Sequence, residues 1–188
     1  PYYNKTTQEG LYAHFMAVAE QTELPVVLYD VPSRTGLEIL PETLSRLCES
    51  GRFLALKESS YQVPLILEKL SAMSGRMTLY SGNDDMVAPL MSLGAQGVIS
   101  VAANAVPREM SEMTAAYLQG RAEEALQRQI RLLPLVRALF AEVSPIPCKR
   151  AMEQLGLCSG ELRLPLIPAG AGVRRQLTDA LRALGALE

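Results

Sequence analysis

The sequence predicts an α/β fold in which parallel strands alternate with helices, followed by a segment made of helices alone. In the first hundred residues, four short apolar runs alternate with longer amphipathic stretches, at spacings of roughly 20–28 residues. Alternating strands and helices of this kind give parallel strands joined by right-handed crossovers. After Ala102 the strand-like runs stop and helical patterns fill the chain. The length of 188 residues suits one domain, or one domain with an appendage.

The four predicted strands are short and almost continuously apolar. Such runs are typical of parallel strands in a sheet whose two faces are both covered by helices. The second run is unusual because it ends in a lysine, Lys57. The four runs span residues 25–30, 53–59, 77–81 and 97–101.

Capping and turn residues predict the helices and turns between these strands. Thr6, as the N-cap, and Glu9 have the spacing of a capping box, so we expect a helix there that runs to about Gln21. The Pro and Gly of residues 31–36 predict a turn. Further helices are expected at residues 41–48, 62–74 and 85–93, the last one preceded by a turn at residues 82–85.

The rest of the chain is predicted to be helical. Pro134 lies inside the longest of these helices and predicts a kink there. The Leu- and Pro-rich stretch 162–168 is expected to be an extended loop packed on the helices, because its prolines disfavour a central strand. The helices are expected at residues 108–119, 122–141, 147–155 and 173–184.

Composition argues against several classes of protein. The formal charge of −2, from 18 basic and 20 acidic residues, does not suit a nucleic-acid-binding face. No apolar run approaches the ~18 residues of a membrane span, and the amino terminus has no signal-peptide pattern. The three irregularly spaced cysteines fit reduced thiols in a cytoplasmic protein better than disulfides or a zinc site. With His14 as the single histidine, a Ser-His-Asp triad and a multi-histidine metal site are disfavoured.

Two architectures fit four β/α units followed by helices. A closed (β/α)8 barrel needs eight strands and typically ~250 residues, whereas an open doubly wound sheet can be built from four. In both architectures the active site lies at the carboxyl ends of the strands. No glycine-rich phosphate-binding loop follows any predicted strand, so a nucleotide-binding open sheet lacks its usual signature.

Lys57, at the carboxyl end of the second predicted strand, is the main candidate for chemistry. Lysine is among the residues least often fully buried. A desolvated lysine loses its proton more easily and can then attack a carbonyl carbon to form an imine. The plain structural alternative is a lysine whose stem packs on apolar neighbours while its ammonium group reaches water.

Tyr29, Arg34 and Gly82 follow other predicted strands at the same edge. The phenol of Tyr29 can relay protons, and the planar guanidinium of Arg34 can hold a carboxylate. Gly82 lets a substrate lie close to the backbone. Taken singly, these residues also fit a core tyrosine, a surface arginine and an ordinary turn. Their order on successive strands favours an active site for a keto acid.

Six segments along nearly the whole chain carry a family resemblance. They are PYYN at residues 1–4, LYDVPSRTG at 28–36, ALKE at 55–58, YSGND at 80–84, GVISV at 97–101 and SPIPCK at 144–149. In this order they resemble the dihydrodipicolinate synthase (4-hydroxy-tetrahydrodipicolinate synthase) family of the N-acetylneuraminate lyase superfamily. The Ser-Arg-Thr-Gly sequence favours this branch over the sialate lyases.

The resemblance implies the second half of a (β/α)8 TIM barrel, with four β/α units in residues 1–120, and a C-terminal helical domain in residues 121–188. It implies a lyase of the class I aldolase type in lysine and diaminopimelate biosynthesis. Lys57 would form a Schiff base with pyruvate, and the resulting enamine would attack L-aspartate semialdehyde. No cofactor and no metal are expected. The usual assembly of the family is a homotetramer, a dimer of dimers.

Further roles are implied by the same resemblance. Tyr29 would relay protons and contact the pyruvate carboxylate, while Arg34 would bind the carboxylate of the aldehyde. The backbone around Gly82 and Ile99 would line the pyruvate site.

At the start of the chain, Tyr3 would complete a proton relay across a dimer interface. Tyr2 would belong to the cleft that binds L-lysine as an inhibitor.

The chain departs from the family in two respects. The first half of the barrel, which carries the family's paired pyruvate-binding threonines, is absent, so we expect this chain to need that half, in cis or from a partner. Asp30 stands where asparagine is more usual in the family.

Two other functions remain open. The aldehyde substrate would be a sugar acid or another oxo acid in other pyruvate-dependent aldolases of the superfamily. From a different class, a non-catalytic half-barrel would act as an interaction or regulatory subunit. The retention of Lys57, Tyr29 and Arg34 argues against that reading, because such a subunit has no physical need for them.

Overall fold

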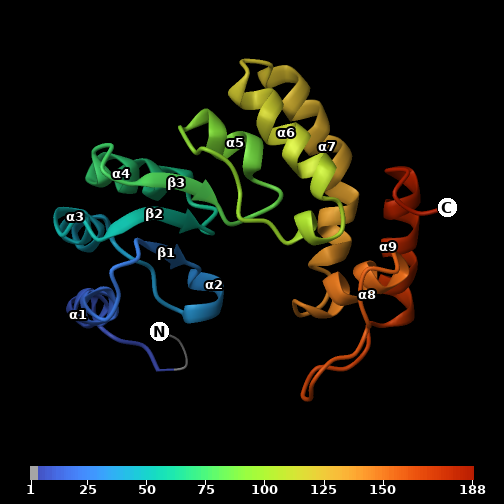
Figure 1. Ribbon diagram of the computed structural model, residues 1–188, viewed down its shortest axis with the longest axis horizontal. Helices are drawn as coiled ribbons and strands as arrows, with labels where there is room; N and C mark the ends of the chain where they lie inside the picture. Colours follow the sequence, from blue (N-terminus) through green and yellow to red (C-terminus); the bar gives the residue numbers. More distant parts are fainter. Residues whose placement is uncertain (1–3) are drawn as a thin grey trace. The chain divides into compact units, whose positions relative to one another are not determined.

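The computed structural model describes residues 4–188 (Figure 1). Tyr2 and Tyr3 lie outside the described residues, so their roles stay predictions. The predicted division into two domains at residue 120 also stays a prediction. The chain divides into two compact units: residues up to Asn83 with Pro89–Ile99, and Asp84–Ala88 with Ser100–Glu188.

A parallel sheet of three strands, in the order β1-β2-β3, forms the centre of the first unit. The strands are β1 (Val26–Asp30), β2 (Phe53–Glu58) and β3 (Thr78–Ser81). β1 pairs in parallel with β2, and β2 pairs in parallel with β3. The predicted α/β class with parallel strands is thereby confirmed, and three of the four predicted strands form where their apolar runs lie.

Helices alternate with these strands (Figure 1). α1 contacts α3, and α3 contacts α4. Leucines that are neighbours in register on the three strands share a buried core with residues of α3 and α4: Leu28, Leu56, Leu79, Leu44, Leu47 and Ile66. The helices are α1 (Gln8–Glu20), α2 (Pro32–Thr35), α3 (Pro41–Glu49), α4 (Val63–Met73) and α5 (Val87–Ser92).

The start of α1 differs from the predicted capping box. Thr7 rather than Thr6 is the N-cap, because its side-chain oxygen accepts a hydrogen bond of 3.1 Å from the backbone N–H of Gly10. Glu9 does not reach back to the cap. Its carboxylate instead forms an ion pair of 2.6 Å with Arg46 of α3. The predicted N-cap was wrong by one residue, and the predicted capping box was wrong.

The turn predicted at residues 31–36 is a single helical turn, α2, with Val31 and Gly36 as its caps. Pro32 occupies the first helical position, which suits its fixed φ and its missing N–H. Gly36 ends the helix in the left-handed conformation, with φ of 67°, and its N–H donates to the carbonyl of Pro32 (2.8 Å).

The predicted fourth strand, at residues 97–101, was wrong. Val98 makes an isolated parallel bridge to β3, and no further ladder follows it in the described chain. The next backbone amides turn elsewhere: those of Val101 and Ala102 donate to the buried carboxylate of Asp84, at 3.0 and 2.8 Å. The four expected β/α units are therefore three strands and one bridge within residues 4–188.

The second unit is helical, as predicted. α7 packs against α6 and α9, and α8 packs against α9 (Figure 1). The elements are the short 3-10 helix η1 (Ala102–Asn104), α6 (Pro107–Leu118), α7 (Ala122–Leu139), α8 (Ile146–Gln154) and α9 (Ala171–Ala183). The core between them is formed by Met113, Leu132, Leu135, Leu139, Leu177 and Leu181.

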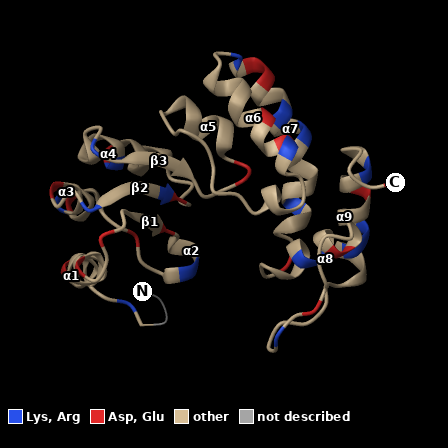
Figure 2. Ribbon diagram, viewed as in Figure 1, with Lys and Arg blue, Asp and Glu red and all other residues tan. Residues whose placement is uncertain are grey.

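Opposite charges lie close together along α6 and α7 (Figure 2). Arg128 of α7 forms ion pairs with Glu124 on its own helix (3.0 Å) and with Glu112 on α6 (2.6 Å). Ion pairs that remain in contact with water contribute only about 0–1 kcal/mol each. The apolar core, rather than this charge network, therefore holds α6 on α7.

Two predictions for the second unit have different outcomes. α7 continues through Pro134, and the kink predicted there stays a prediction. Residues 162–168 form no helix or strand, as predicted. Leu162 lines a small pocket beside α8, but Leu164 is 84% exposed at a turn closed by the N–H of Leu166. The expected packing was therefore wrong at the tip of this loop.

The cap of α1 gives a paired test of this part of the fold. Thr7→Ala should lower the free energy of unfolding by about 0.5–2 kcal/mol, because the N–H of Gly10 loses its acceptor. Thr6→Ala is the matched control and should change it by less than about 0.5 kcal/mol. Urea denaturation followed by circular dichroism measures both. A larger loss for Thr6→Ala would contradict the assigned cap.

Candidate active site

The register of the sheet brings three side chains together on one face. Tyr29 on β1 lies beside Lys57 on β2, and Lys57 lies beside Tyr80 on β3. Because side chains of a strand alternate between the two faces, these three project from the same face, close to the carboxyl ends of their strands. Lys57 thus has an aromatic residue on each side.

Lys57 and Tyr29 are in direct contact. The Nζ atom of Lys57 lies 4.0 Å from the centroid of the Tyr29 ring, which is within the range of a cation–π interaction. Lys57 is half-buried, and Tyr29 is 42% exposed. Lys57 is therefore less desolvated in this chain than the imine hypothesis expected, because nothing in the described chain covers this face of β1.

The turn after β3 passes close to Lys57. The backbone N–H of Gly82 donates to the carbonyl of Glu58 at 2.7 Å. A Cβ atom at residue 82 would overlap with Oγ of Ser59 and would lie 3.1 Å from Cγ of Lys57. Glycine is therefore favoured here by the close approach of two strand ends. Oγ of Ser59 is buried and has no hydrogen-bond partner among the described residues.

Ile99 and Arg34 have different surroundings. The backbone N–H of Ile99 donates to the carbonyl of Ser81 (2.9 Å), which holds Ile99 at the end of β3 with its side chain exposed. Arg34 lies in α2, directly after β1, and is exposed. Within residues 4–188 its guanidinium forms no ion pair and no hydrogen bond. It is therefore free to bind a carboxylate from solution.

The opposite face of the sheet carries a buried ionic cluster, formed by Asp30, Glu58 and Lys69. Asp30 and Glu58 directly follow Tyr29 and Lys57 and are also neighbours in register. Lys69 reaches them from α4. Its Nζ atom lies 2.6 Å from Oδ2 of Asp30 and 2.8 Å from Oε2 of Glu58. The side chains of Lys69, Asp30 and Glu58 are 1%, 2% and 0% exposed.

Burial and the attraction between opposite charges together set the pKa values of this cluster. Burial raises the pKa of Asp30 and of Glu58, because loss of water disfavours the charged carboxylates more than the nearby ammonium favours them. Burial alone would lower the pKa of Lys69, but the attraction of Glu58 and Asp30 outweighs it and raises this pKa. Lys69 is therefore held in its charged form. Glu38, whose Oε1 is 3.9 Å from Nζ of Lys69, adds a third negative group nearby.

Lys69, Tyr80 and Ser59 had no role predicted from the sequence. A lysine inside a helix is normally expected to be exposed. Only the spacing of Lys69 from buried residues of the same helix contradicts this expectation. Lys69 lies three residues after Ile66 and four before Met73, on the face of α4 that those two residues bury. A buried cation there requires buried acids, and the sequence supplies them directly after two candidate site residues.

The described part of the chain shows no sign of several other kinds of site. Among those residues, no group of histidine, cysteine, aspartate and glutamate side chains is arranged to hold a metal ion. The three cysteines are free thiols. None of the described helices has the length and apolar character needed to cross a membrane.

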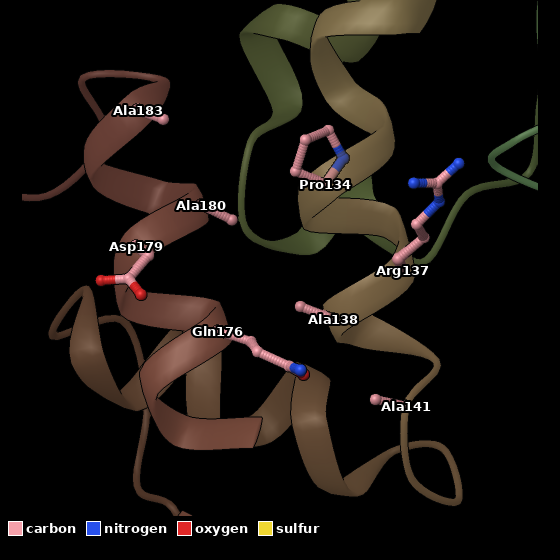
Figure 3. Close-up of a pocket in the computed structure, with 8 residues that line it drawn as sticks. All are labelled: Pro134, Arg137, Ala138, Ala141, Gln176, Asp179, Ala180 and Ala183. Carbon is pink, nitrogen blue, oxygen red and sulfur yellow. The ribbon is translucent and has the colours of Figure 1, made fainter. Parts of the chain in front are cut away.

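A separate pocket lies between α7 and α9 in the second unit (Figure 3). Its volume is about 490 Å³. Alanines form much of its wall, and none of the predicted site residues lines it. The lining residues are Pro134, Arg137, Ala138, Ala141, Gln176, Asp179, Ala180 and Ala183.

Comparison with known proteins gives a consistent result. The model of the dihydrodipicolinate synthetase family matches residues 1–184. A curated relative, the 4-hydroxy-tetrahydrodipicolinate synthase of Acetivibrio thermocellus, is 51% identical over 166 residues, which are 88% of this chain and 56% of the relative.

Solved structures of similar proteins cover the chain completely. The chloride-inhibited dihydrodipicolinate synthase of Acinetobacter baumannii, complexed with pyruvate, matches with a TM-score of 0.94 and 41% identity. The enzyme of Cyanidioschyzon merolae with lysine bound matches with a TM-score of 0.95 and 40% identity. Both matches cover 100% of this chain and 64% of the solved chain. The chain therefore spans less than two thirds of the length of these proteins.

The close approach at Gly82 is directly testable. Gly82→Ala should lower the free energy of unfolding by about 1–3 kcal/mol, because the new methyl group forces Ser59 to move. Gly172→Ala is the matched control: it has open space in α9 and should raise stability by up to about 1 kcal/mol. Denaturant titration measures both. Equal effects of the two substitutions would show that the contact at Gly82 is not tight.

Proposed function

The chain belongs to the dihydrodipicolinate synthetase family, and on that premise we propose that it carries the imine-forming part of a 4-hydroxy-tetrahydrodipicolinate synthase. Such an enzyme condenses pyruvate with L-aspartate semialdehyde in lysine and diaminopimelate biosynthesis. The single observation that supports this best is the position of Lys57. It lies at the carboxyl end of β2, on the open face of the sheet, between Tyr29 and Tyr80.

In the proposed reaction, the unprotonated Nζ of Lys57 attacks the C2 carbonyl carbon of pyruvate. Loss of water gives the imine, and loss of a proton from C3 gives the enamine. C3 then bonds to the aldehyde carbon of the second substrate, and hydrolysis of the new imine frees Lys57. Each step moves a proton, so a donor and acceptor must lie within hydrogen-bond reach. We assign this relay to Tyr29, whose ring already touches Nζ.

Three further residues are proposed to bind the substrates. The backbone around Gly82 and Ile99 would line the pyruvate site, and the approach of Gly82 to Lys57 supports this. Arg34 would bind the carboxylate of the aldehyde, since its exposed guanidinium has no ionic partner among the described residues.

Tyr3 would complete the proton relay from the partner subunit, and Tyr2 would contact L-lysine as an inhibitor. The solved relative with lysine bound supports that last proposal.

We propose that this chain forms the second half of a (β/α)8 barrel, residues 1–120, and a helical domain, residues 121–188. Val27 and Tyr29 are 45% and 42% exposed on the face that carries Lys57. Exposed apolar side chains on a sheet favour aggregation unless another element covers them. The remainder of the barrel would cover this face and desolvate Lys57, and the complete protein would assemble as a dimer of dimers.

A second candidate is a non-catalytic half-barrel that binds other chains. The exposed side chains of Val27 and Tyr29 on the open face of the sheet favour it, because another chain could cover them. Among catalytic alternatives, the aldehyde would be a sugar acid or another oxo acid. Incubation with pyruvate and a panel of aldehydes separates these substrates by the product formed.

Borohydride trapping tests the proposed imine. The chain is incubated with pyruvate and sodium borohydride, alone and with a polypeptide that matches the remaining part of the Acetivibrio thermocellus relative. We expect one reduced pyruvate adduct per chain in intact-mass measurements. Lys57→Ala should abolish the adduct. Lys149→Ala is the matched control, because Lys149 is half-buried like Lys57, and it should leave the adduct unchanged.

The two incubations distinguish the explanations of a negative result. An adduct that forms only with the added polypeptide would show that the chain needs the rest of the barrel. An adduct that survives in Lys57→Ala would remove Lys57 from the chemistry. No adduct in either incubation would favour the non-catalytic half-barrel.

Arg34→Ala tests the second substrate in the complemented protein. We expect kcat/KM for L-aspartate semialdehyde to fall roughly 10–100-fold, the value of a charge-assisted hydrogen bond to a carboxylate, while pyruvate trapping stays unchanged. Arg108→Ala, at another exposed arginine, is the control. Steady-state kinetics with the aldehyde varied measures the effect, and an unchanged kcat/KM would rule out the proposed contact.

A further inference from the structure

The buried ionic cluster and the candidate active site are the two faces of one pair of strands. Tyr29 is the register neighbour of Lys57, and in the next position Asp30 is the register neighbour of Glu58. Whatever holds Asp30 against Glu58 therefore also sets how Tyr29 lies against Lys57. The connection is one peptide unit long on each strand.

Lys69 is the group that holds the two acids together. Its Nζ atom donates to both carboxylates, at 2.6 Å to Asp30 and 2.8 Å to Glu58. Without its ammonium group, two carboxylates would face each other in a site that excludes water. Like charges so placed repel, and breaking a buried ion pair on one side is strongly destabilising.

The two carboxylates of the cluster also bind the backbone of the segments that follow both strands. Oδ2 of Asp30 also accepts from the backbone N–H of Ile39 (3.1 Å), and Oε1 of Glu58 accepts from that of Ser60 (2.6 Å). Between the strands, the N–H of Ser59 donates to the carbonyl of Asp30 (3.0 Å). The cluster is therefore tied to the backbone on both sides of the site.

We propose that Lys69 is a positioning residue for Lys57 and Tyr29, which acts by locking Asp30 to Glu58 on the far face of the sheet. This inference rests on the proposed function and goes beyond it, because Lys69 touches neither of the two residues. It also gives a reason for the acid at position 30. An asparagine there would accept a hydrogen bond from Lys69 but would leave the buried ammonium with less compensating charge.

The structure predicts which end of β1 and β2 the ionic cluster holds together. The cluster lies at the carboxyl ends of β1 and β2, whereas the amino ends are joined separately, by the N–H of Val26 and the carbonyl of Arg52 (3.1 Å). Loss of Lys69 should loosen the carboxyl end alone. Misplacement of reacting groups by about 1 Å can cost about 10²-fold in rate, so a local loosening is enough to slow the reaction.

The first test is amide hydrogen exchange of the chain, which does not depend on activity. Lys69→Met removes the ammonium group and keeps a similar length. A second variant, Asp30→Asn/Glu58→Gln/Lys69→Met, also removes the charges of these two acids, so that neither position 30 nor position 58 is left with an unpaired carboxylate. In both variants we expect the amide of Ser59 to exchange at least about tenfold faster relative to that of Val26. Arg46→Met, which breaks the exposed pair with Glu9, should leave this ratio unchanged.

The second test is the rate of the complemented enzyme. We expect kcat to fall about 10²-fold in the triple variant, with KM for pyruvate changed far less and the borohydride adduct on Lys57 retained. Asp30→Asn, whose single side-chain oxygen can still accept from both Lys69 and the N–H of Ile39, should keep most of the rate.

The outcomes separate positioning from mere stability. The proposal is overturned if the triple variant has wild-type stability together with the wild-type exchange ratio. It is also overturned if this variant has the wild-type kcat. In either case Lys69 serves only folding. If the wild-type protein forms no adduct on Lys57, the proposed function fails, and the exchange ratio alone still decides whether Lys69 holds the two strand ends together.

Discussion

The parallel register of β1, β2 and β3 is the constraint on which the rest of the first unit depends. It places Tyr29, Lys57 and Tyr80 in one row on the open face and Asp30 and Glu58 in the next row on the buried face. A shift of one residue would exchange the two faces. It would bury Lys57 without a partner and expose the acids that Lys69 needs, so the core and the candidate site specify the same register.

The buried face and the open face of the sheet differ in how fully the charges on them are compensated, and this difference explains which residues each face carries. On the buried face, charge is tolerated because each acid has a direct hydrogen bond from Lys69 and a second one from a backbone amide. On the open face, the contact shown for the Lys57 amine within residues 4–188 is the ring of Tyr29. A reactive amine needs such incomplete compensation, since a strong ion pair would hold its proton.

Much of this arrangement could be predicted from the sequence, because it rests on local patterns. The apolar run before Lys57, the order of strands and helices and the helical second unit all follow from periodicity and turn residues. The predictions failed where distant contacts decide. Thr6 and Thr7 are equivalent candidates for the N-cap until the contact with Gly10 distinguishes them. The run after Gly97 pairs with β3 only briefly, through the amide of Ile99, before the amides of Val101 and Ala102 donate to Asp84. Lys69 was missed because its partner Asp30 is 39 residues away.

The central claim is that the open face of the sheet is the place where pyruvate becomes covalently bound. The most direct measurement is a crystal structure of the chain together with a polypeptide that supplies the part of a relative not covered by this chain. The sample is reduced with borohydride in the presence of pyruvate before crystallisation. We expect continuous electron density from Nζ of Lys57 to C2 of pyruvate, beside Tyr29 and Tyr80. Density for pyruvate on another lysine, or on the opposite face of the sheet, would contradict it.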